Sequence, residues 1–236
     1  MDMNKRIDAI LGMMKERNMF PGVHRYCYEL NVDDELTVIK AIGKARSQAF
    51  TIDEHCRFAY ENIVKWCIGD NTAMAQDPTT KKPIAANMEK GWWIAGNTGS
   101  GKSWCLEIIT AYCHAMRFQV DFGDSKGKLT WRNVRADDLV NQYMADGTME
   151  CRSYHILGIQ DVGTEQQETV YMGNRMPLIR SFLEYRGDRH DQITMVTSNL
   201  PIEHPKITEL YGDRVASRLN EMFNYVEIRG IDRRKK

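Results

Sequence analysis

Apolar residues recur at helical spacing in three stretches near the start of the chain. The first stretch is closed by Pro21-Gly22 and places five apolar residues on one face: Met3, Ile7, Ile10, Leu11 and Met14. The second covers about residues 33–48 and also has one apolar face. The third is expected to begin at Thr51, because Glu54 stands three residues later and completes a capping-box pattern. The pattern therefore predicts three amphipathic helices.

The helical periodicity is absent over residues 69–90. Turn-forming residues occupy this stretch, including Pro78, Pro83 and Asn87. A long loop or linker is therefore predicted ahead of the next apolar segment.

Beyond this loop, short apolar strands alternate with amphipathic helices. The predicted strands cover residues 92–95, 129–134, 154–160, 193–197 and 225–229. The predicted helices cover residues 102–116, 136–145, 171–185 and 213–222, with Pro177 as an expected kink in the third. Strands that alternate with helices predict a parallel sheet covered on both faces.

Charge narrows the range of partners. Lysine plus arginine and aspartate plus glutamate balance at 32 each, so any contact with a polyanion would have to be a local patch. One basic stretch contains a single aromatic residue: Lys126, Lys128, Trp131, Arg132 and Arg135. It is either a surface that binds single-stranded DNA or an edge strand with solvated charges and a buried tryptophan.

The composition favours a cytoplasmic protein with no membrane attachment. The first ten residues are too polar for a secretory signal, and no apolar run is long enough to span a bilayer. The six cysteines form no CxxC pair and have no regular spacing, so reduced thiols are expected. The six histidines are scattered and indicate no metal site.

One segment carries a specific binding chemistry. Directly between a predicted strand and a predicted helix, the pattern GxxxxGK[ST] is met at every fixed position by Gly96-Asn97-Thr98-Gly99-Ser100-Gly101-Lys102-Ser103. Glycines let the backbone curl so that successive N–H groups face an anion, and the helix N-terminus adds its positive dipole end. Lys102 is expected to reach the β- and γ-phosphates, and the Ser103 hydroxyl to ligate Mg²⁺. The segment therefore predicts a P-loop that binds ATP.

Polar residues follow two of the predicted strands. Asp161 comes directly after the strand at 154–160, at the carboxyl end where parallel sheets bind ligands. It is a candidate to hold the metal and orient water, and the alternative is a turn residue or a helix cap. The strand at 193–197 runs into the small polar residues Thr197-Ser198-Asn199. These could meet a γ-phosphate or an attacking water, or they could form an ordinary strand end.

Two arginines share a face of the last predicted helix. Arg214 and Arg218 are four residues apart, so both guanidiniums point the same way. They could form surface ion pairs. In an assembling ATPase, such an arginine instead reaches a neighbour's nucleotide and stabilises transition-state charge. Spacing alone leaves both interpretations open.

Together these motifs resemble the DnaC/IstB-like clade of AAA+ ATPases, the bacterial helicase loaders and transposition helper ATPases. The resemblance runs from about residue 51 to the C-terminus and includes the closing Gly230-Ile231-Asp232-Arg233-Arg234. It implies an α/β fold, a P-loop NTPase with an AAA+ core and a five-stranded parallel sheet. The P-loop strand would be central, and no C-terminal helical lid is expected. Residues 1–50 would form a helical N-terminal appendage, and residues 51–236 the ATPase domain.

The resemblance also implies roles for single residues. Ser198 or Asn199 would be the sensor-1 polar group. Arg218 would be the arginine finger, with Arg214 as its neighbour. ATP and Mg²⁺ would be the cofactors.

One departure from the clade concerns the metal. Its members usually have two acidic residues where this chain has Gln160-Asp161. Gln160 then occupies the metal-holding place and Asp161 the water-activating one, so hydrolysis would be slow or absent. Alternatively, Asp161 holds Mg²⁺ together with Ser103, and Glu165 lies nearby.

The leading functional prediction is an ATP-controlled loader in DNA replication. ATP would promote assembly into homo-oligomers, and the N-terminal helices would hold a hexameric replicative helicase for delivery to single-stranded DNA. Those helices could equally pack onto the core. An IstB-like transposition helper that binds a transposase is the alternative within the clade. Outside it, Gln160 suggests a non-hydrolysing, ATP-gated adaptor. A small-molecule kinase is disfavoured because no arginine-rich lid segment is evident.

Overall fold

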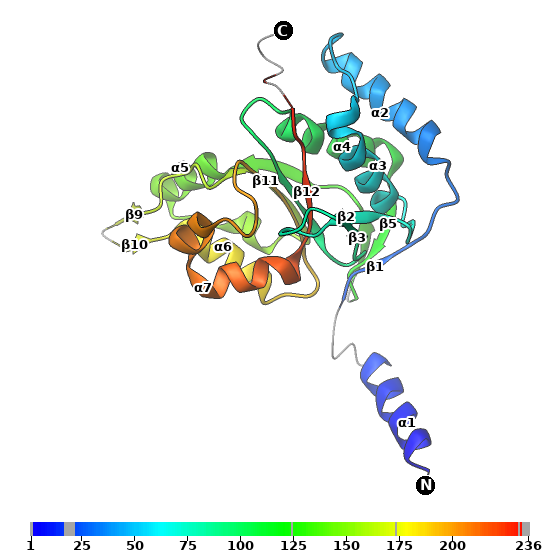
Figure 1. Ribbon diagram of the computed structural model, residues 1–236. Coiled ribbons are helices and arrows are strands. Elements are labelled where there is room, and N and C mark those ends of the chain that lie inside the picture. The colour runs from blue at the N-terminus through cyan, green and yellow to red at the C-terminus, as the bar shows by residue number, and fades with distance from the viewer. Residues whose placement is uncertain (1, 17–21, 124, 173, 231, 233–236) are drawn as a thin grey trace.

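A five-stranded parallel sheet forms the centre of the molecule (Figure 1). The computed structural model describes residues 2–16, 22–123, 125–172, 174–230 and 232. The strands lie in the order β12 (Phe223–Glu227), β4 (Gly91–Ala95), β11 (Ile193–Ser198), β8 (Ile156–Val162) and β7 (Arg132–Arg135). All four pairings are parallel, so the predicted α/β fold is confirmed. The expected central position of the P-loop strand is wrong, because β4 lies second from one edge and β11 lies in the middle.

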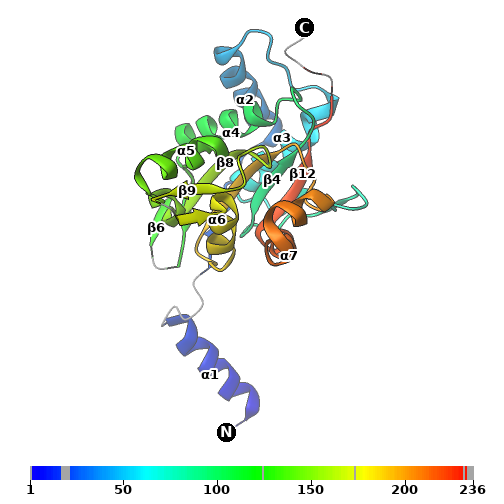
Figure 2. The same cartoon turned by 90° about the vertical axis from the view of Figure 1, so that its left-hand side faces the viewer.

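Helices cover both faces of this sheet (Figure 2). One hydrophobic cluster joins the sheet to α2 (Val32–Arg46), α3 (Glu54–Cys67) and α4 (Lys102–Met116). A second cluster joins it to α5 (Ala136–Asp146), α6 (Leu178–Gly187) and α7 (Pro205–Met222). Successive side chains of a strand point to opposite faces. In β4, Trp92 and Ile94 accordingly belong to the first cluster, and Trp93 and Ala95 to the second.

Several short strands lie outside the main sheet. The sequence pattern did not predict them, because a strand of two or three residues has no measurable period. The hairpins pair β2 (Met74–Gln76) with β3 (Pro83–Ala85) and β9 (Thr169–Tyr171) with β10 (Asn174–Met176). A three-stranded sheet has the order β1 (His24–Arg25), β5 (Gln119–Asp121) and β6 (Lys126–Lys128). The range 69–90 therefore contains a hairpin rather than only a loop.

Some element ends differ from the prediction. The N-cap of α3 is Asp53, whose side chain accepts the N–H of His55, and not Thr51. Pro177 is the N-cap of α6 rather than a kink within a longer helix, because the residues before it form the β9–β10 hairpin. The last helix begins earlier than expected, at Pro205, and is kinked at Gly212 (φ 81°, ψ 162°).

The expectation of reduced thiols stays a prediction, and the structure shows how the cysteines are buried. Six free cysteines are present, and four of them are buried: Cys56, Cys67, Cys105 and Cys113.

A short 3-10 turn (Glu150–Ser153) precedes β8. Among the helices that the structure describes, none combines the length and apolar content needed to cross a membrane.

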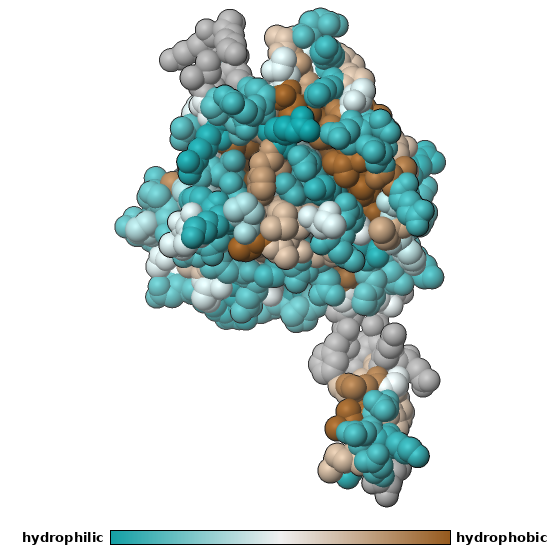
Figure 3. All heavy atoms as spheres, turned by 45° about the vertical axis from the view of Figure 1, so that its right-hand side comes forward, coloured by the Kyte–Doolittle hydropathy of each residue, from teal (hydrophilic) through white to brown (hydrophobic). Residues whose placement is uncertain are grey.

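The N-terminal helices differ in their surroundings. The amphipathic helix α1 (Met3–Glu16) lies apart from the sheet in Figures 1 and 2. Most of its large apolar side chains are exposed, and they gather on one side, as Figure 3 shows. In contrast, Leu36 and Ile39 of α2 are buried in the first cluster. The sequence left two interpretations of these helices, partner binding and packing onto the core. Packing onto the core describes α2. The domain boundary at residue 50 stays a prediction.

Candidate nucleotide-binding site

The loop between β4 and α4 is folded tightly against the end of the sheet. Gly99 and Gly101 have φ angles of 79° and 99°, a region that glycine adopts without steric cost. The N–H of Gly96 donates to the backbone oxygen of Ser198 at 3.2 Å, which fixes the start of the loop to β11. The N–H of Ser100 donates to the oxygen of Asn97 at 3.1 Å. The predicted loop thus turns on itself ahead of a helix N-terminus, the arrangement that binds anions.

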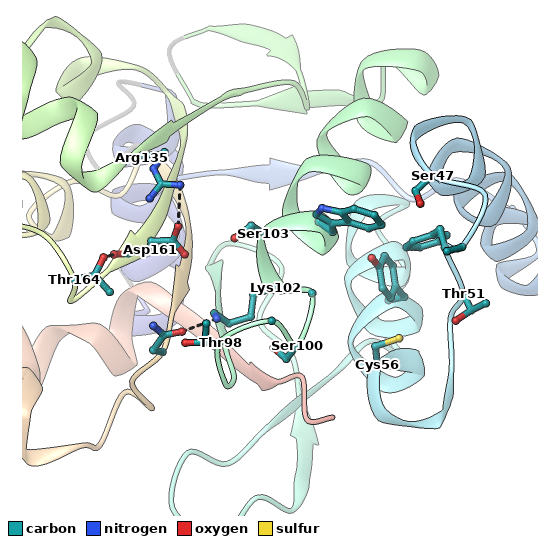
Figure 4. Close-up of a pocket in the computed structure, with 17 residues that line it drawn as sticks. Ser47, Thr51, Cys56, Thr98, Ser100, Lys102, Ser103, Arg135, Asp161 and Thr164 are labelled. Atoms are coloured by element: carbon teal, nitrogen blue, oxygen red, sulfur yellow. Dashed lines mark hydrogen bonds and ion pairs between the residues drawn. The ribbon is translucent and has the colours of Figure 1, made fainter. Parts of the chain in front are cut away.

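The ammonium group of Lys102 is held at this loop. Lys102 is only 5% exposed, and its Nζ donates to Asn199 Oδ1 at 2.7 Å and to the oxygen of Asn97 at 3.2 Å. Figure 4 shows this side chain reaching across the loop. Ser100 Oγ is buried and has no hydrogen-bond partner within the described chain. A buried cation beside an unsatisfied hydroxyl fits an anionic ligand, since both groups lose water that a phosphate oxygen could replace.

A cavity of about 540 Å³ opens from the loop. Its lining includes residues 98–103 and the aromatic residues Phe50, Tyr60 and Trp104. The Phe50 and Tyr60 rings lie edge to face with centroids 5.9 Å apart. The lining therefore combines a polar, cationic part with an apolar, aromatic part, a combination that suits a nucleotide.

Asp161 lines the opposite wall of this cavity, where Figure 4 shows it beside Arg135. Its backbone is left-handed (φ 59°), and its N–H donates to Thr197 Oγ1 at 3.0 Å. A carboxylate oxygen lies 3.5 Å from a guanidinium nitrogen of Arg135. Asp161 is part of β8 rather than following it, and it lines the cavity. The structure thus brings Asp161 and the P-loop together.

Arg135 is a residue of the site that sequence reasoning did not assign to it. It ends β7, where it is paired in register with Gln160 of β8. The available signal was positional: a charged residue at the carboxyl end of a strand next to the one that carries Asp161.

Two polar residues at the carboxyl end of β11, Ser198 and Asn199, have different surroundings. Asn199 lines the cavity and accepts from Lys102. Ser198 is fully buried, where its Oγ donates to the oxygen of Val162 at 2.6 Å and accepts the N–H of Leu200 at 3.0 Å. Of the two candidates for the polar group, Asn199 is the one that faces the cavity.

Gln160 and Glu165 are the two residues near Asp161 that the sequence suggested for the metal site. Neither of them offers a carboxylate to the cavity. Gln160 donates from Nε2 to Glu107 Oε1 at 3.0 Å. Glu165 is 6% exposed, and it accepts from Tyr211 Oη at 2.5 Å and from the N–H of Gly163 at 2.7 Å. Burial, together with the charge of Glu165, raises the pKa of Tyr211 above its usual value. Glu165 is therefore engaged in holding the loop after β8.

Arg214 and Arg218 do not line the cavity. Both pair with Asp188, which follows α6: Arg214 at 3.5 Å, and Arg218 through a closer contact. The side chain of Arg214 is 62% exposed and that of Arg218 is 27% exposed. Any contact of these arginines with a nucleotide would have to involve a second molecule.

The basic stretch near β6 is an edge structure rather than a stacking platform. Trp131 is 4% exposed, and its indole N–H donates to Asn133 Oδ1 at 3.0 Å. A base cannot stack on a buried ring, so the interpretation as a single-strand-binding surface with Trp131 is wrong. Lys126 and Lys128 are exposed at the edge strand β6.

Asp232 lies against the P-loop. Its carboxylate occupies the space that a Cβ on Gly99 would need. A side chain at position 99 would therefore clash with Asp232. Of the closing signature, Ile231, Arg233 and Arg234 lie outside the described residues.

The donors present fit Mg²⁺ only in combination with phosphate. Ser103 and Asp161 line the cavity. Across the described residues, no group of three or more histidine, cysteine, aspartate or glutamate side chains could hold a metal by itself. Magnesium is commonly bound through one or two protein groups together with substrate phosphates, so the site fits the metal in that form.

Comparison with solved structures supports the fold. A crystal structure of a "putative primosome component" from Streptococcus pyogenes serotype M3 matches 77% of this chain and 83% of its own, with 16% identity and a TM-score of 0.51. A crystal structure of the DnaC helicase loader matches 77% of this chain and 94% of its own, with 16% identity and a TM-score of 0.49. No protein-family profile and no curated protein matches the sequence. At this identity the likeness shows a shared fold.

Proposed function

We propose that this chain is an ATP-binding AAA+ protein that acts as a helicase loader-like factor in DNA replication. The observation that carries the proposal is the buried ammonium of Lys102 inside a complete P-loop, at the mouth of a cavity large enough for a nucleotide. The primosome component named above has a similar fold, which is consistent with a role in replication.

ATP would bind with its phosphates in the loop of residues 96–103. Lys102 would exchange its bonds to Asn97 and Asn199 for the β- and γ-phosphates. The N-terminus of α4 would add its dipole. The base would lie at the aromatic part of the cavity lining, near Phe50 and Trp104. Mg²⁺, held by Ser103 and Asp161, would offset the phosphate charge.

Hydrolysis would depend on Asp161 and Asn199. In the alternative to metal binding, Asp161 would accept a proton from the attacking water, and Asn199 can hydrogen-bond the γ-phosphate or that water. In the free protein Arg135 pairs with Asp161, so the carboxylate must leave this ion pair, or share it, to act as a base. Turnover is therefore expected to be slow.

Assembly would supply the groups that the cavity lacks. Arg218 is partly exposed on α7, with the more exposed Arg214 beside it, and both arginines pair with Asp188. In a homo-oligomer this arginine would contact the nucleotide of a neighbouring subunit and stabilise the charge of its transition state.

The partner would bind through the N-terminus. Helix α1 exposes an apolar face that includes Ile7, Ile10 and Leu11. Such a face fits a groove on a second protein, here a replicative helicase. Single-stranded DNA remains a proposed ligand, and its binding would have to use residues other than Trp131.

One alternative is supported by a specific observation. Gln160 stands beside Asp161 and is bonded to Glu107, so among the described residues Asp161 supplies the only carboxylate in the lining of the cavity. A protein with this arrangement could bind ATP without hydrolysing it and act as an ATP-gated adaptor.

Phosphate release and light scattering, measured together with ATP, with ADP and without nucleotide, test the proposal. A larger mass with ATP alone, accompanied by slow phosphate release that Lys102→Ala abolishes, is the expected result. A larger mass with no phosphate release would favour the adaptor. An identical mass in all three conditions would contradict control of assembly by ATP.

A further inference from the structure

Two buried thiols touch each other between α3 and α4. Cys67 is the last residue of α3, and Cys113 lies on α4, the helix that begins at Lys102. Their sulfur atoms are 3.5 Å apart, and both side chains are fully buried. Because bonded sulfur atoms lie about 2.05 Å apart, an approach of about 1.5 Å is enough to join these two. The pair is therefore placed for an intramolecular disulfide.

A buried cation lies beside this pair. The guanidinium of Arg25 donates to the backbone oxygens of Trp66 and Cys67 at 2.9 Å and 2.8 Å, and its carbon lies 4.2 Å from the centroid of the Trp66 ring. Its Nε and Nη1 are buried without a hydrogen-bond partner in the part of the chain that the structure describes. Buried donors without an acceptor leave this positive charge incompletely satisfied. Negative charge on a neighbouring sulfur atom would satisfy it.

Burial and charge act on the thiols in opposite directions. Burial, together with the hydrogen bond to Cys67, raises the pKa of Cys113 above its usual value, whereas the charge of Arg25 lowers it. The resting pair is therefore protonated and reduced, because its surroundings disfavour the charged form. The same cation stabilises a thiolate once one forms, and the thiolate is the form that reacts with oxidants.

A short segment lies against the end of α3 that carries Cys67. It contains β1, which is two residues long, includes Arg25 and pairs with β5. Beyond β1, the N–H of Tyr28 donates to the backbone oxygen of Ile68 at 2.8 Å, and Cys27 of the same segment is exposed. Short segments at the surface open locally more readily than the core. An oxidant as small as hydrogen peroxide therefore reaches the thiols when this segment opens.

We infer that Cys67 and Cys113 form a dithiol that hydrogen peroxide oxidises to a disulfide between α3 and the P-loop helix. In the first step, one thiolate attacks an oxygen of the peroxide, the O–O bond breaks, and a sulfenic acid and hydroxide form. The second thiol then attacks the sulfenic sulfur, so that the S–S bond forms and water leaves. In total, two thiols lose two electrons and two protons, and one peroxide is reduced to two waters. This chemistry is independent of the proposed nucleotide binding.

Thiol counting after peroxide treatment tests the inference. The full chain with Cys27→Ser, which removes the exposed thiol of this segment, is treated with hydrogen peroxide, unfolded and alkylated with N-ethylmaleimide. Mass spectrometry of its peptides is expected to show Cys67 and Cys113 joined to each other and separated again by dithiothreitol. The linked protein should unfold at a urea concentration about 1 M higher, since the disulfide closes a long loop.

Further variants in the same Cys27→Ser chain show whether the pair and its cation are specific. Cys113→Ser should abolish the link, whereas Cys105→Ser, at another buried thiol of α4, should leave it unchanged. Arg25→Met should slow formation of the link about tenfold, because the cation that favours the thiolate is lost. Arg25→Lys should keep the rate within about twofold of that with arginine, since it keeps the charge. A merely structural role of Arg25 predicts faster oxidation in Arg25→Met, because a looser segment opens more often.

Alkylation of both thiols after peroxide treatment, or a link that Cys113→Ser leaves in place, would overturn the inference. A link that forms only in unfolding concentrations of urea would also overturn it, because the folded protein would then keep the oxidant from the pair. Faster oxidation of Arg25→Met would contradict the role given to the cation. If Arg25→Met does not fold, the two serine variants on α4 still decide whether the dithiol exists.

Discussion

At the scale of single residues, a buried arginine shows how this chain satisfies its backbone. Arg186 is 1% exposed and lies at the end of α6. Its guanidinium donates to the backbone oxygens of Arg152 at 3.0 Å, Tyr154 at 2.7 Å and Ile193 at 2.6 Å, and to Thr194 Oγ1 at 2.7 Å. Burial lowers the pKa of Arg186 to about 9. One side chain therefore caps several carbonyls where β8 and β11 begin.

Replacement of this guanidinium should destabilise the fold. Arg186→Met fills much of the same space but removes the guanidinium that donates to three backbone carbonyls, at a cost of about 3 kcal/mol in the free energy of unfolding. Urea denaturation measures this loss. Arg57→Met removes an exposed arginine of α3 and should change stability by less than about 0.5 kcal/mol. Equal stability of Arg186→Met and wild type would contradict the role given to these bonds.

The residues of the site were predictable to different degrees. The P-loop was identifiable because phosphate binding fixes both the residue types and their spacing, so Lys102 and Ser103 follow from the pattern alone. Arg135 was named only as part of a basic stretch and was not assigned to the site. Its place there depends on strand register, which no local pattern encodes.

At the scale of elements, length decided what the sequence could predict. The helix at 102–116 was predicted with its observed bounds because it spans four turns of apolar periodicity. The β9–β10 hairpin was instead read as the start of a helix. Its strands have three residues each, too few to distinguish alternation from helical spacing.

A buried hydrogen bond connects the loop after β8 to the last helix. Tyr211 is 1% exposed and lies just before the kink of α7 at Gly212. Its hydroxyl donates to Glu165, whose other oxygen accepts the N–H of Gly163. The loop next to Asp161 is therefore held by the same helix that carries Arg218.

Tyr211→Phe should weaken this connection without creating a cavity. The change leaves a buried carboxylate short of one donor and is expected to cost about 2 kcal/mol of stability, measured by thermal or urea unfolding. Tyr26→Phe, at a tyrosine that is 42% exposed, is the matched control and should be neutral. A neutral Tyr211→Phe would indicate that Glu165 has another partner of equal strength.

At the scale of the whole molecule, the groups proposed for catalysis lie on separate surfaces. The P-loop, Asp161 and Asn199 meet at one cavity, whereas Arg214 and Arg218 contact Asp188 outside its lining. The sequence could not show which of these groups lie together, because it does not give the order of the strands in the sheet. The alternation of strands and helices predicts a parallel sheet but not which strands are neighbours.

Removal of the proposed finger should separate assembly from binding. Arg218→Ala is expected to keep the ATP affinity within about twofold of wild type, while the ATP-dependent increase in mass is lost, since its charge is needed only across an interface. Light scattering and nucleotide titration measure both effects. Arg57→Ala removes an equal charge from α3 and should assemble normally. If Arg218→Ala assembles as wild type does, another group makes the contact between subunits.

The central claim is that a buried ammonium in the P-loop holds a polyphosphate. Calorimetric titration of the wild-type protein and of Lys102→Ala with ATP and Mg²⁺ tests it most directly. The expected result is saturable binding at one site per chain for the wild type and a loss of about 100-fold or more in affinity for the variant, as for truncation of one partner in a buried charge pair. No heat of binding from the wild-type protein at millimolar ATP, or equal affinity in the variant, would contradict the account.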